Sequence, residues 1–278
     1  WHGYVKEKHM KRRVVVTGIG ALTPIGNNVN DTWKGILNHQ CGIDLIQSFD
    51  TSNMKVKVAG ELKNFEATEY LDKKDVRKMD KFIQYGLIAA KEAIKDSKLE
   101  IDSINHDRFG VVVSSGIGGL GSIEENHQRG LKKGFDRVSP YFIPMTIVNL
   151  AAGQIAIAFQ AQGLATCPVT ACAGGTNAIG DAFRNIRDGY LDVTIAGGCE
   201  ASITPLGIGG FTSMKALSES HDPKRASIPF DKERNGFVMG EGAGMLVLEE
   251  LEHAKARGAH IYCEMVGYGV SCDAYHMT

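Results

Sequence analysis

Apolar residues in this chain form short continuous runs that alternate with longer segments of helical spacing. The runs are rich in Val and Ile, and their length is typical of β-strands. Because these runs are continuous rather than alternating, they predict a sheet that is buried on both faces. The predicted strands cover residues 13–17, 109–114, 166–170, 192–196, 245–248 and 261–270.

Helical periodicity is clearest in two segments between these runs. Residues 80–97 place Phe82, Ile83, Leu87, Ile88 and Ile94 on one face. Residues 179–186 repeat the pattern, with charged residues on the other side and a glycine at 189 as the stop signal. Strands that alternate with helices predict an α/β fold with a largely parallel sheet.

Composition and charge narrow the function classes. The chain has 278 residues, of which 43% are apolar and 23% charged, and its net charge is −1. This balance gives no overall attraction to nucleic acid or to a membrane surface, and no apolar stretch reaches membrane-spanning length. The six cysteines are scattered without a CxxC pair, which argues against a metal site and favours a reducing cytoplasm. Residues 1–9 look like a tag or an upstream remnant before Met10.

Cys172 has the setting of a nucleophile. In VTACAGGTNAIGDAF (Val169–Phe183) it lies between a predicted strand and a predicted helix. A helix N-terminus favours a thiolate and offers N–H groups to an oxyanion, while small neighbours leave room for a substrate. This arrangement indicates acyl transfer through a thioester. The alternative is a small buried cysteine. Cys199 also follows two glycines, but no helix start is directed at it.

A glycine pattern raises a rival function of a different class. Residues 116–121 read GIGGLG, which matches the GxGxxG of dinucleotide-binding proteins and follows a predicted strand. That fold also requires a strand ending in an acidic residue about twenty positions further on. The sequence there, GFDRVSPYFIP, is loop-like. The glycines are better explained by a loop that passes close to an acyl chain.

Several motifs in order resemble the β-ketoacyl-acyl-carrier-protein synthases, and the elongating type II kind most. They are VTACAGGTNAIGDAFR, RRVVVTGIGALTPIG, SSGIGGLG, AGGCEASITPLGIGGF, FDKERNGFVMGEGAG and DAYHMT. The resemblance implies the layered thiolase-like fold (α-β-α-β-α). Residues 10–260 would form the N-terminal half, and residues 261–278 the start of a C-terminal half. We therefore expect this chain to be the nucleophile-bearing part of a longer enzyme.

The resemblance also implies a reaction and roles for individual residues. An acyl group would move from acyl carrier protein to Cys172, and malonyl carrier protein would then lose carbon dioxide and attack the thioester. Neither a metal nor an organic cofactor would be required. Ile117 would line the acyl pocket, Phe211 would be an aromatic gate, and Thr278 with His276 would lie at the pantetheine channel. Plain core packing is the alternative for Ile117 and Phe211. The two histidines and the lysine needed for condensation would follow DAYHMT.

Basic residues are the candidate dock for the acidic carrier protein, and the family is typically homodimeric. The alternative is a solvated helix face, the usual meaning of a charge run. The candidates are Lys73, Lys74, Arg77, Lys78, Lys132, Lys133, Arg137 and Lys215.

Relatives with the same fold remain as rivals. Polyketide ketosynthases usually carry serines after the cysteine, where this chain has Ala173, Gly174 and Gly175. The initiating synthase lacks the DKERNGFVMGEGAG pattern, while thiolase and a non-enzymatic role stay open. The sequence leaves acyl-chain length undecided. It also does not distinguish the type II synthase from its close elongating sibling. Whether the protein has a C-terminal part beyond this sequence stays open as well.

Overall fold

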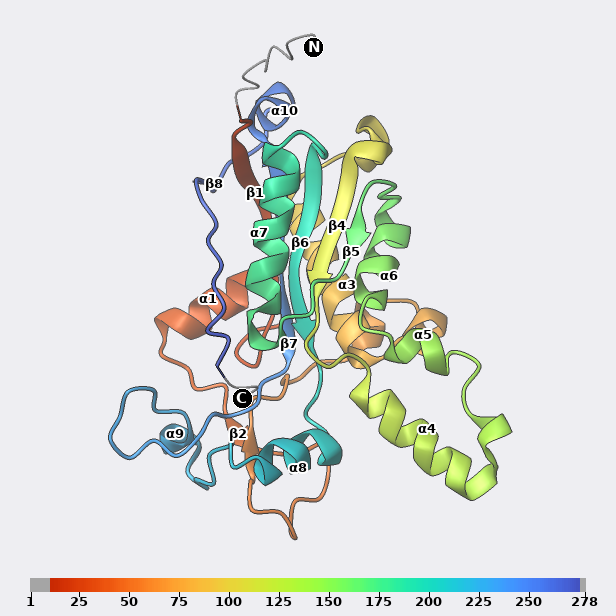
Figure 1. Cartoon of the computed structure of the whole chain (residues 1–278), viewed down its shortest axis with the longest axis vertical. Coiled ribbons are helices and arrows are strands. Elements are labelled where there is room, and N and C mark those ends of the chain that lie inside the picture. Colours follow the sequence, from red (N-terminus) through yellow and green to blue (C-terminus); the bar gives the residue numbers. More distant parts are fainter. Residues whose placement is uncertain (1–10, 276–278) are drawn as a thin grey trace.

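A six-stranded mixed sheet forms the centre of the computed structural model, which describes residues 11–275 (Figure 1). The strand order is β5-β4-β6-β7-β1-β8, and two further short strands, β2 and β3, pair separately. The strands are β1 (Val14–Leu22), β2 (Asp44–Leu45), β3 (Val58–Ala59), β4 (Phe109–Ser114), β5 (Ala165–Thr166), β6 (Val193–Glu200), β7 (Gly242–Glu250) and β8 (Cys263–Met265).

The prediction of a largely parallel sheet is wrong. β4 is parallel to β5 and β6, but β7 is antiparallel to both β6 and β1, and β8 is antiparallel to β1. Continuous apolar strands indicate that both faces of the sheet are covered. A sheet covered on both faces can contain parallel or antiparallel strands, so this pattern does not determine strand direction. The α/β class itself is confirmed, since helices cover both faces of the sheet (Figure 1).

The helices divide between the two faces. α3 and α6 pack on one face of the sheet, and α7 packs on the other (Figure 1). The α-helices are α1 (Val29–Leu37), α2 (Lys73–Val76), α3 (Lys81–Ser97), α4 (Leu120–Lys133), α5 (Phe142–Thr146), α6 (Leu150–Phe159), α7 (Gly174–Arg187), α8 (Pro205–Ser213), α9 (Pro223–Ala226) and α10 (Leu251–Ala256). The 3-10 turns are η1 (Ala67–Glu69), η2 (Ile101–Ser103), η3 (His106–Arg108), η4 (Phe135–Arg137) and η5 (Ala171–Ala173).

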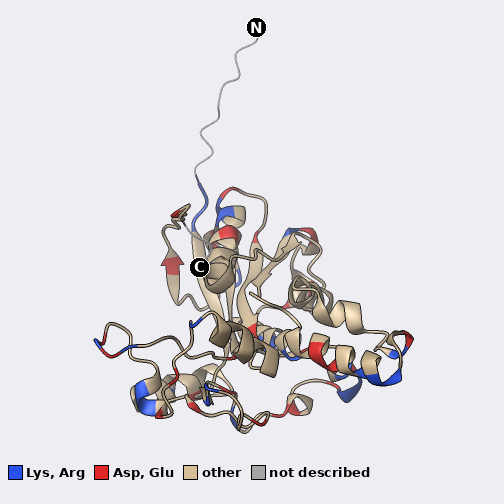
Figure 2. Ribbon diagram, turned by 60° about the horizontal axis from the view of Figure 1, so that its bottom comes forward, with Lys and Arg blue, Asp and Glu red and all other residues tan. Residues whose placement is uncertain are grey.

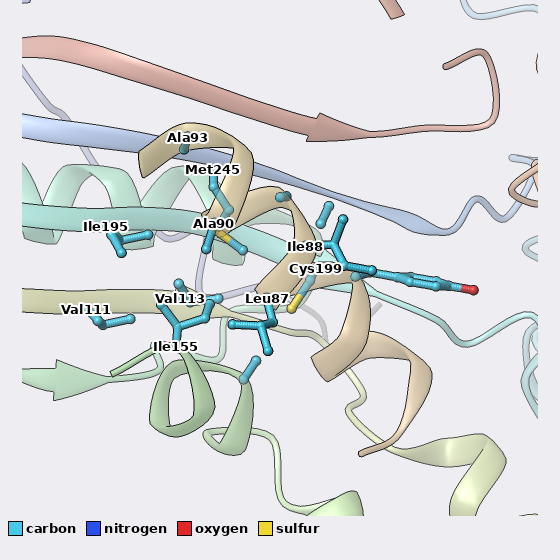
Figure 3. Packing of buried hydrophobic residues seen from close by; sticks show 14 of the residues in the cluster. Leu87, Ile88, Ala90, Ala93, Val111, Val113, Ile155, Ile195, Cys199 and Met245 are labelled. Atoms are coloured by element: carbon cyan, nitrogen blue, oxygen red, sulfur yellow. The ribbon is translucent and has the colours of Figure 1, made fainter. Parts of the chain in front are cut away.

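The larger core lies between α3, α6 and the sheet (Figure 3). α3 approaches β1 very closely, because a Cβ added at Gly20 would lie 1.9 Å from the carbonyl oxygen of Ala89. The same helix satisfies backbone groups of β1: Glu92 accepts from Ala21 N and Asp96 accepts from Ile19 N, each at 2.9 Å. α3 therefore fixes β1 by both packing and hydrogen bonds.

Both predicted helices are confirmed. Asp80 caps the N-terminus of α3 by accepting from Phe82 N at 3.1 Å. Gly189, with φ of 87°, follows the end of α7 in a left-handed conformation that glycine adopts without strain.

Two predicted strands are longer than the observed ones. The run 166–170 yields only β5, and Pro168 beyond it has no N–H for a ladder. The run 261–270 yields only β8, since Gly267 and Gly269 provide no side chains to pack. Residues 1–9, His276 and Thr278 lie outside the described residues, so the predictions made for them, and the predicted domain boundaries, stay predictions. Within residues 11–275 no helix is long and apolar enough to cross a membrane.

Candidate active site

A sharp backbone turn places Cys172 at the start of α7. Ala171 has φ of 49°, in the left-handed region that costs a residue with a Cβ about 1–2 kcal/mol. Cys172 follows in η5, and α7 begins two residues later. Its thiol is exposed and lines a cavity of about 650 Å³. The predicted turn between strand and helix is therefore present, although irregular chain separates β5 from it.

Hydrogen bonds hold the segment that leads to this turn. Ser114 Oγ, at the end of β4, donates to the carbonyl of Pro168 at 2.6 Å. On the other side, Thr170 Oγ1 donates to Asn177 of α7 at 2.6 Å, and Asn177 in turn donates to the hydroxyl of Tyr268. The chain before Cys172 is thus attached both to the sheet and to its own helix.

Glycines bring α7 close to the ends of the strands. A Cβ at Gly174 would lie 2.0 Å from Ser114 Oγ, so no larger residue fits there without displacement. A Cβ at Gly175 would make only an ordinary contact, 3.7 Å from Gly198. Cys172 and Gly175 both line the cavity, so the start of α7 lies at its wall. A helix leaves the N–H groups of its first turn without intrahelical partners.

The structure brings Cys172, Ile117 and Phe211 together at this one cavity. Both Ile117 and Phe211 are half-buried. Phe211 packs edge to face against Phe237, with ring centroids 5.4 Å apart, and Phe237 lines the cavity too. This volume is typical of a small-molecule site. The proximity is the one the resemblance implied, while the roles of Ile117 and Phe211 remain predictions.

The sequence analysis did not identify two acidic residues that line the cavity, Glu200 and Glu241. Glu200 accepts four hydrogen bonds, among them those from Gly116 N at 2.7 Å and Ile117 N at 3.1 Å. Glu241 accepts from Leu62 N at 2.9 Å, and burial raises the pKa of its carboxyl. Their only signal in the sequence is an acidic residue in a glycine-rich motif, AGGCE for the first and GEGAG for the second.

The cavity holds a second thiol with a different environment. Cys199 is buried, and its sulfur lies 3.8 Å from the carbonyl oxygen of Ser114. Burial raises the pKa of Cys199 well above its ordinary value, and the nearby charge of Glu200 adds to this effect. Cys199 therefore stays a thiol, which is a poor nucleophile.

The dinucleotide hypothesis does not fit the glycine loop. α4 does begin at Leu120, after the glycines. However, the N–H groups of Gly116 and Ile117, which a phosphate would require, already donate to Glu200. Among residues 11–275, no group of three His, Cys, Asp or Glu side chains is arranged to hold a metal ion.

The candidate docking residues are all exposed, but they lie in separate places. The first four are in and just after α2, and Lys78 pairs with Asp75 at 3.1 Å. Lys132 and Lys133 end α4, and Arg137 ends η4. Lys215 follows α8 beside a pocket that Lys55 also lines. A carrier-protein surface thus remains a prediction.

Sequence comparison identifies relatives of this arrangement. A family model described as "Beta-ketoacyl synthase, N-terminal domain" matches residues 11–254. The 3-oxoacyl-[acyl-carrier-protein] synthase 2 of Synechocystis sp. is 53% identical over 96% of the chain and 65% of its own length. That of Vibrio cholerae has the same identity and coverage. The Staphylococcus aureus protein is 51% identical over 96% of the chain and 64% of its own length. The chain thus spans about 65% of the length of these curated relatives.

Solved structures show the same fold. A ketosynthase structure described as a type II polyketide acyl-carrier protein in complex with its ketosynthase matches with a TM-score of 0.86 and 34% identity. A β-ketoacyl synthase from Burkholderia phymatum matches with a TM-score of 0.87 and 31% identity. Each match covers 96% of the present chain. It covers 65% of the first ketosynthase chain and 66% of the Burkholderia phymatum chain. The expected fold is confirmed as a mixed α/β, thiolase-like N-terminal ketosynthase domain.

Proposed function

Since the chain belongs to the β-ketoacyl synthase family, we propose that it carries the nucleophile of a 3-oxoacyl-[acyl-carrier-protein] synthase of fatty acid elongation. One observation carries the proposal: Cys172 lies in the turn η5 just before α7 and lines the cavity that Ile117 and Phe211 share. The 53% identity to relatives named synthase 2, against 34% to the polyketide ketosynthase, supports the fatty acid reaction.

In the first half-reaction, the Cys172 thiolate attacks the thioester carbonyl of an acyl carrier protein. A carbon–sulfur bond to Cys172 forms and the carbon–sulfur bond to the carrier breaks. The carrier sulfur leaves as a thiol, taking up the equivalent of the proton that the Cys172 thiol gave up. In this scheme the amide of Cys172 and the N–H groups at the start of α7 stabilise the oxyanion, as the family resemblance implies for the amide. Apolar residues of the lining, among them Leu22, Ile117 and Met239, can receive an apolar chain.

In the second half-reaction, malonyl carrier protein loses carbon dioxide, and its carbanion forms a carbon–carbon bond to the acyl carbon. The Cys172 sulfur leaves and recovers a proton. We propose that the histidines and lysine for this step come from segments that follow DAYHMT in the family. Neither a metal nor an organic cofactor is part of this scheme.

We propose acyl carrier protein as the macromolecular substrate, docked by the basic residues around α2 and the end of α4. Figure 2 shows Lys and Arg at the end of α4 farthest from the sheet. Lys78 lies close enough to Tyr141 to interact with it electrostatically, which places α2 near the segment that follows η4. In this proposal one acidic partner spans both basic groups.

We further propose a homodimer in the cytoplasm. Large apolar side chains are exposed on the segment from α4 to α6, next to the edge strand β5, and a second copy would cover them. They include Leu131, Phe135, Ile143 and Ile157, which are 58–72% exposed. All six cysteines are free, as expected in a reducing compartment. Analytical ultracentrifugation of the wild type and Ile157→Arg tests this interface. We expect the wild type to sediment as a dimer and the variant as a monomer.

The acylation step is tested by intact mass after incubation with decanoyl carrier protein, followed by peptide mapping. We expect one decanoyl group on Cys172. Cys172→Ala should show none, while Cys199→Ala should be acylated normally because its thiol stays protonated. An adduct on another cysteine, or none on the folded protein, would contradict the proposal.

A further inference from the structure

Glu200 ends β6 at the wall of the cavity, where its carboxylate is fully engaged by donors. Oε2 accepts from Gly116 N at 2.7 Å and from Ile117 N at 3.1 Å. Oε1 accepts from Ser202 Oγ at 2.9 Å and from Ser115 Oγ at 3.1 Å. A carboxylate beside an apolar cavity is tolerable only when its oxygens are satisfied in this way.

Three of these four donors belong to the loop that carries Ile117. Ser115 also accepts from Gly118 N at 3.1 Å, so the side-chain contact extends across the turn. The loop leads from β4 to α4 and rests on one side chain of the neighbouring strand, β6. Hydrogen bonds to an ionised acceptor are about twice as strong as neutral ones. Glu200 is therefore the main attachment of this loop to the sheet.

The close approach of the carboxylate depends on glycine. A Cβ at Gly116 would lie 2.9 Å from Glu200 Oε2 and 3.7 Å from the carbonyl oxygen of Ala171. Gly116 and Ala171, the residue that turns the chain toward Cys172, therefore lie near one another at the cavity wall. Displacement of the loop would move Ile117 relative to the thiol, with the cavity between them.

We propose that Glu200 is a positioning residue for acyl-chain selection: it holds Ile117 at the cavity wall and so sets which chain lengths fit beside Cys172. The inference rests on the proposed acyl transfer. Without the carboxylate, the N–H groups of Gly116 and Ile117 lose their acceptor, and the loop adopts several positions. The cavity then discriminates less between short and long chains.

The test compares the wild type with Glu200→Ala and Glu200→Gln. Rates of Cys172 acylation by hexanoyl, decanoyl and tetradecanoyl carrier protein are followed by intact mass. A parallel series uses N-alkyl chloroacetamides of matched chain length, which need only a reactive thiol. The control is Glu249→Gln, which alters a buried carboxylate on β7 bonded to Thr17, His253 and Arg257, away from the cavity lining.

Glu200→Ala should change the hexanoyl-to-tetradecanoyl rate ratio by about tenfold toward unity, the factor that about 1.4 kcal/mol represents. Glu200→Gln should fall between it and the wild type, because an amide oxygen can still accept from the loop. Glu249→Gln should keep the wild-type ratio even where its melting temperature falls.

A wild-type ratio in Glu200→Ala would overturn the inference. If Glu200→Ala does not fold, the rate ratio of Glu200→Gln is the deciding measurement. A wild-type ratio in Glu200→Gln would then overturn the inference. Failure of every carrier thioester to acylate the wild type would instead refute the proposed function. The chloroacetamide series would then still measure the effect of Glu200 on the cavity.

Discussion

The buried carboxylate of Glu249 gives the sharpest prediction about stability. Its side chain is fully buried on β7. His253 Nδ1 donates to it at 2.8 Å and Arg257 Nε at 2.9 Å, while Thr17 adds a further hydrogen bond from the point where the β1 register shifts. Burial by itself raises the pKa of Glu249, but these hydrogen bonds and the charge of Arg257 outweigh it and lower the pKa to about 2.

The magnitude follows from linkage between protonation and folding. A pKa lowered from 4.5 to about 2 corresponds to about 3 kcal/mol of stability. Because the folded-state pKa of Glu249 is the lower one, this stability is present above pH 4.5 and is lost as the pH falls toward 2. By pH 3, about 2 kcal/mol of it should be gone.

The assay is urea unfolding of the wild type and Glu249→Gln between pH 7 and pH 3. At pH 7 the variant should be about 3–5 kcal/mol less stable, because it leaves Arg257 without its buried partner. The difference should narrow by about 2 kcal/mol at pH 3. Glu252→Gln, which affects an exposed pair with Lys255, is the matched control and should change little. A difference for Glu249→Gln that stays constant with pH would refute the reasoning.

Two further predictions concern the docking surface and the start of α7. Lys74→Glu combined with Arg77→Glu should raise the KM for acyl carrier protein several-fold while leaving alkylation of Cys172 by iodoacetamide unchanged, and an unchanged KM would exclude this dock. Gly174→Ala should destabilise the protein by about 1–3 kcal/mol because its Cβ would overlap Ser114 Oγ, whereas Gly175→Ala should be tolerated; equal unfolding midpoints in urea would contradict this packing.

The sequence predicted the elements whose signals are local. The spacing of apolar residues located α3 and α7, and the small residues after Cys172 indicated the turn before α7. Strand direction was not accessible in this way. α8 and α9 lie between β6 and β7 in the sequence, and β7 then pairs antiparallel to β6. The apolar run of β7 would be the same for either strand direction. Strand length failed where Pro168 or the glycines beyond β8 end the pairing.

The site was predicted only where one residue type carried the chemistry. Cys172 stood out because a thiol at a helix start is unusual, whereas Ile117 and Phe211 could be placed beside it only through the family resemblance. Glu241 directly precedes β7 at the cavity and accepts a hydrogen bond from Leu62 N, a partner far away in the sequence. Such contacts depend on the tertiary fold, so no local pattern reports them.

The glycine loop shows why a motif match can mislead. A strand, three glycines and a helix do occur in order, as in a phosphate-binding loop. Both uses need glycine for the same reason, because loop N–H groups must approach an anion closely. In this chain the anion is internal: Glu200 takes the place that a phosphate would occupy. The pattern thus predicts a loop that surrounds a negative charge, and the fold decides whether that charge belongs to a ligand or to the protein.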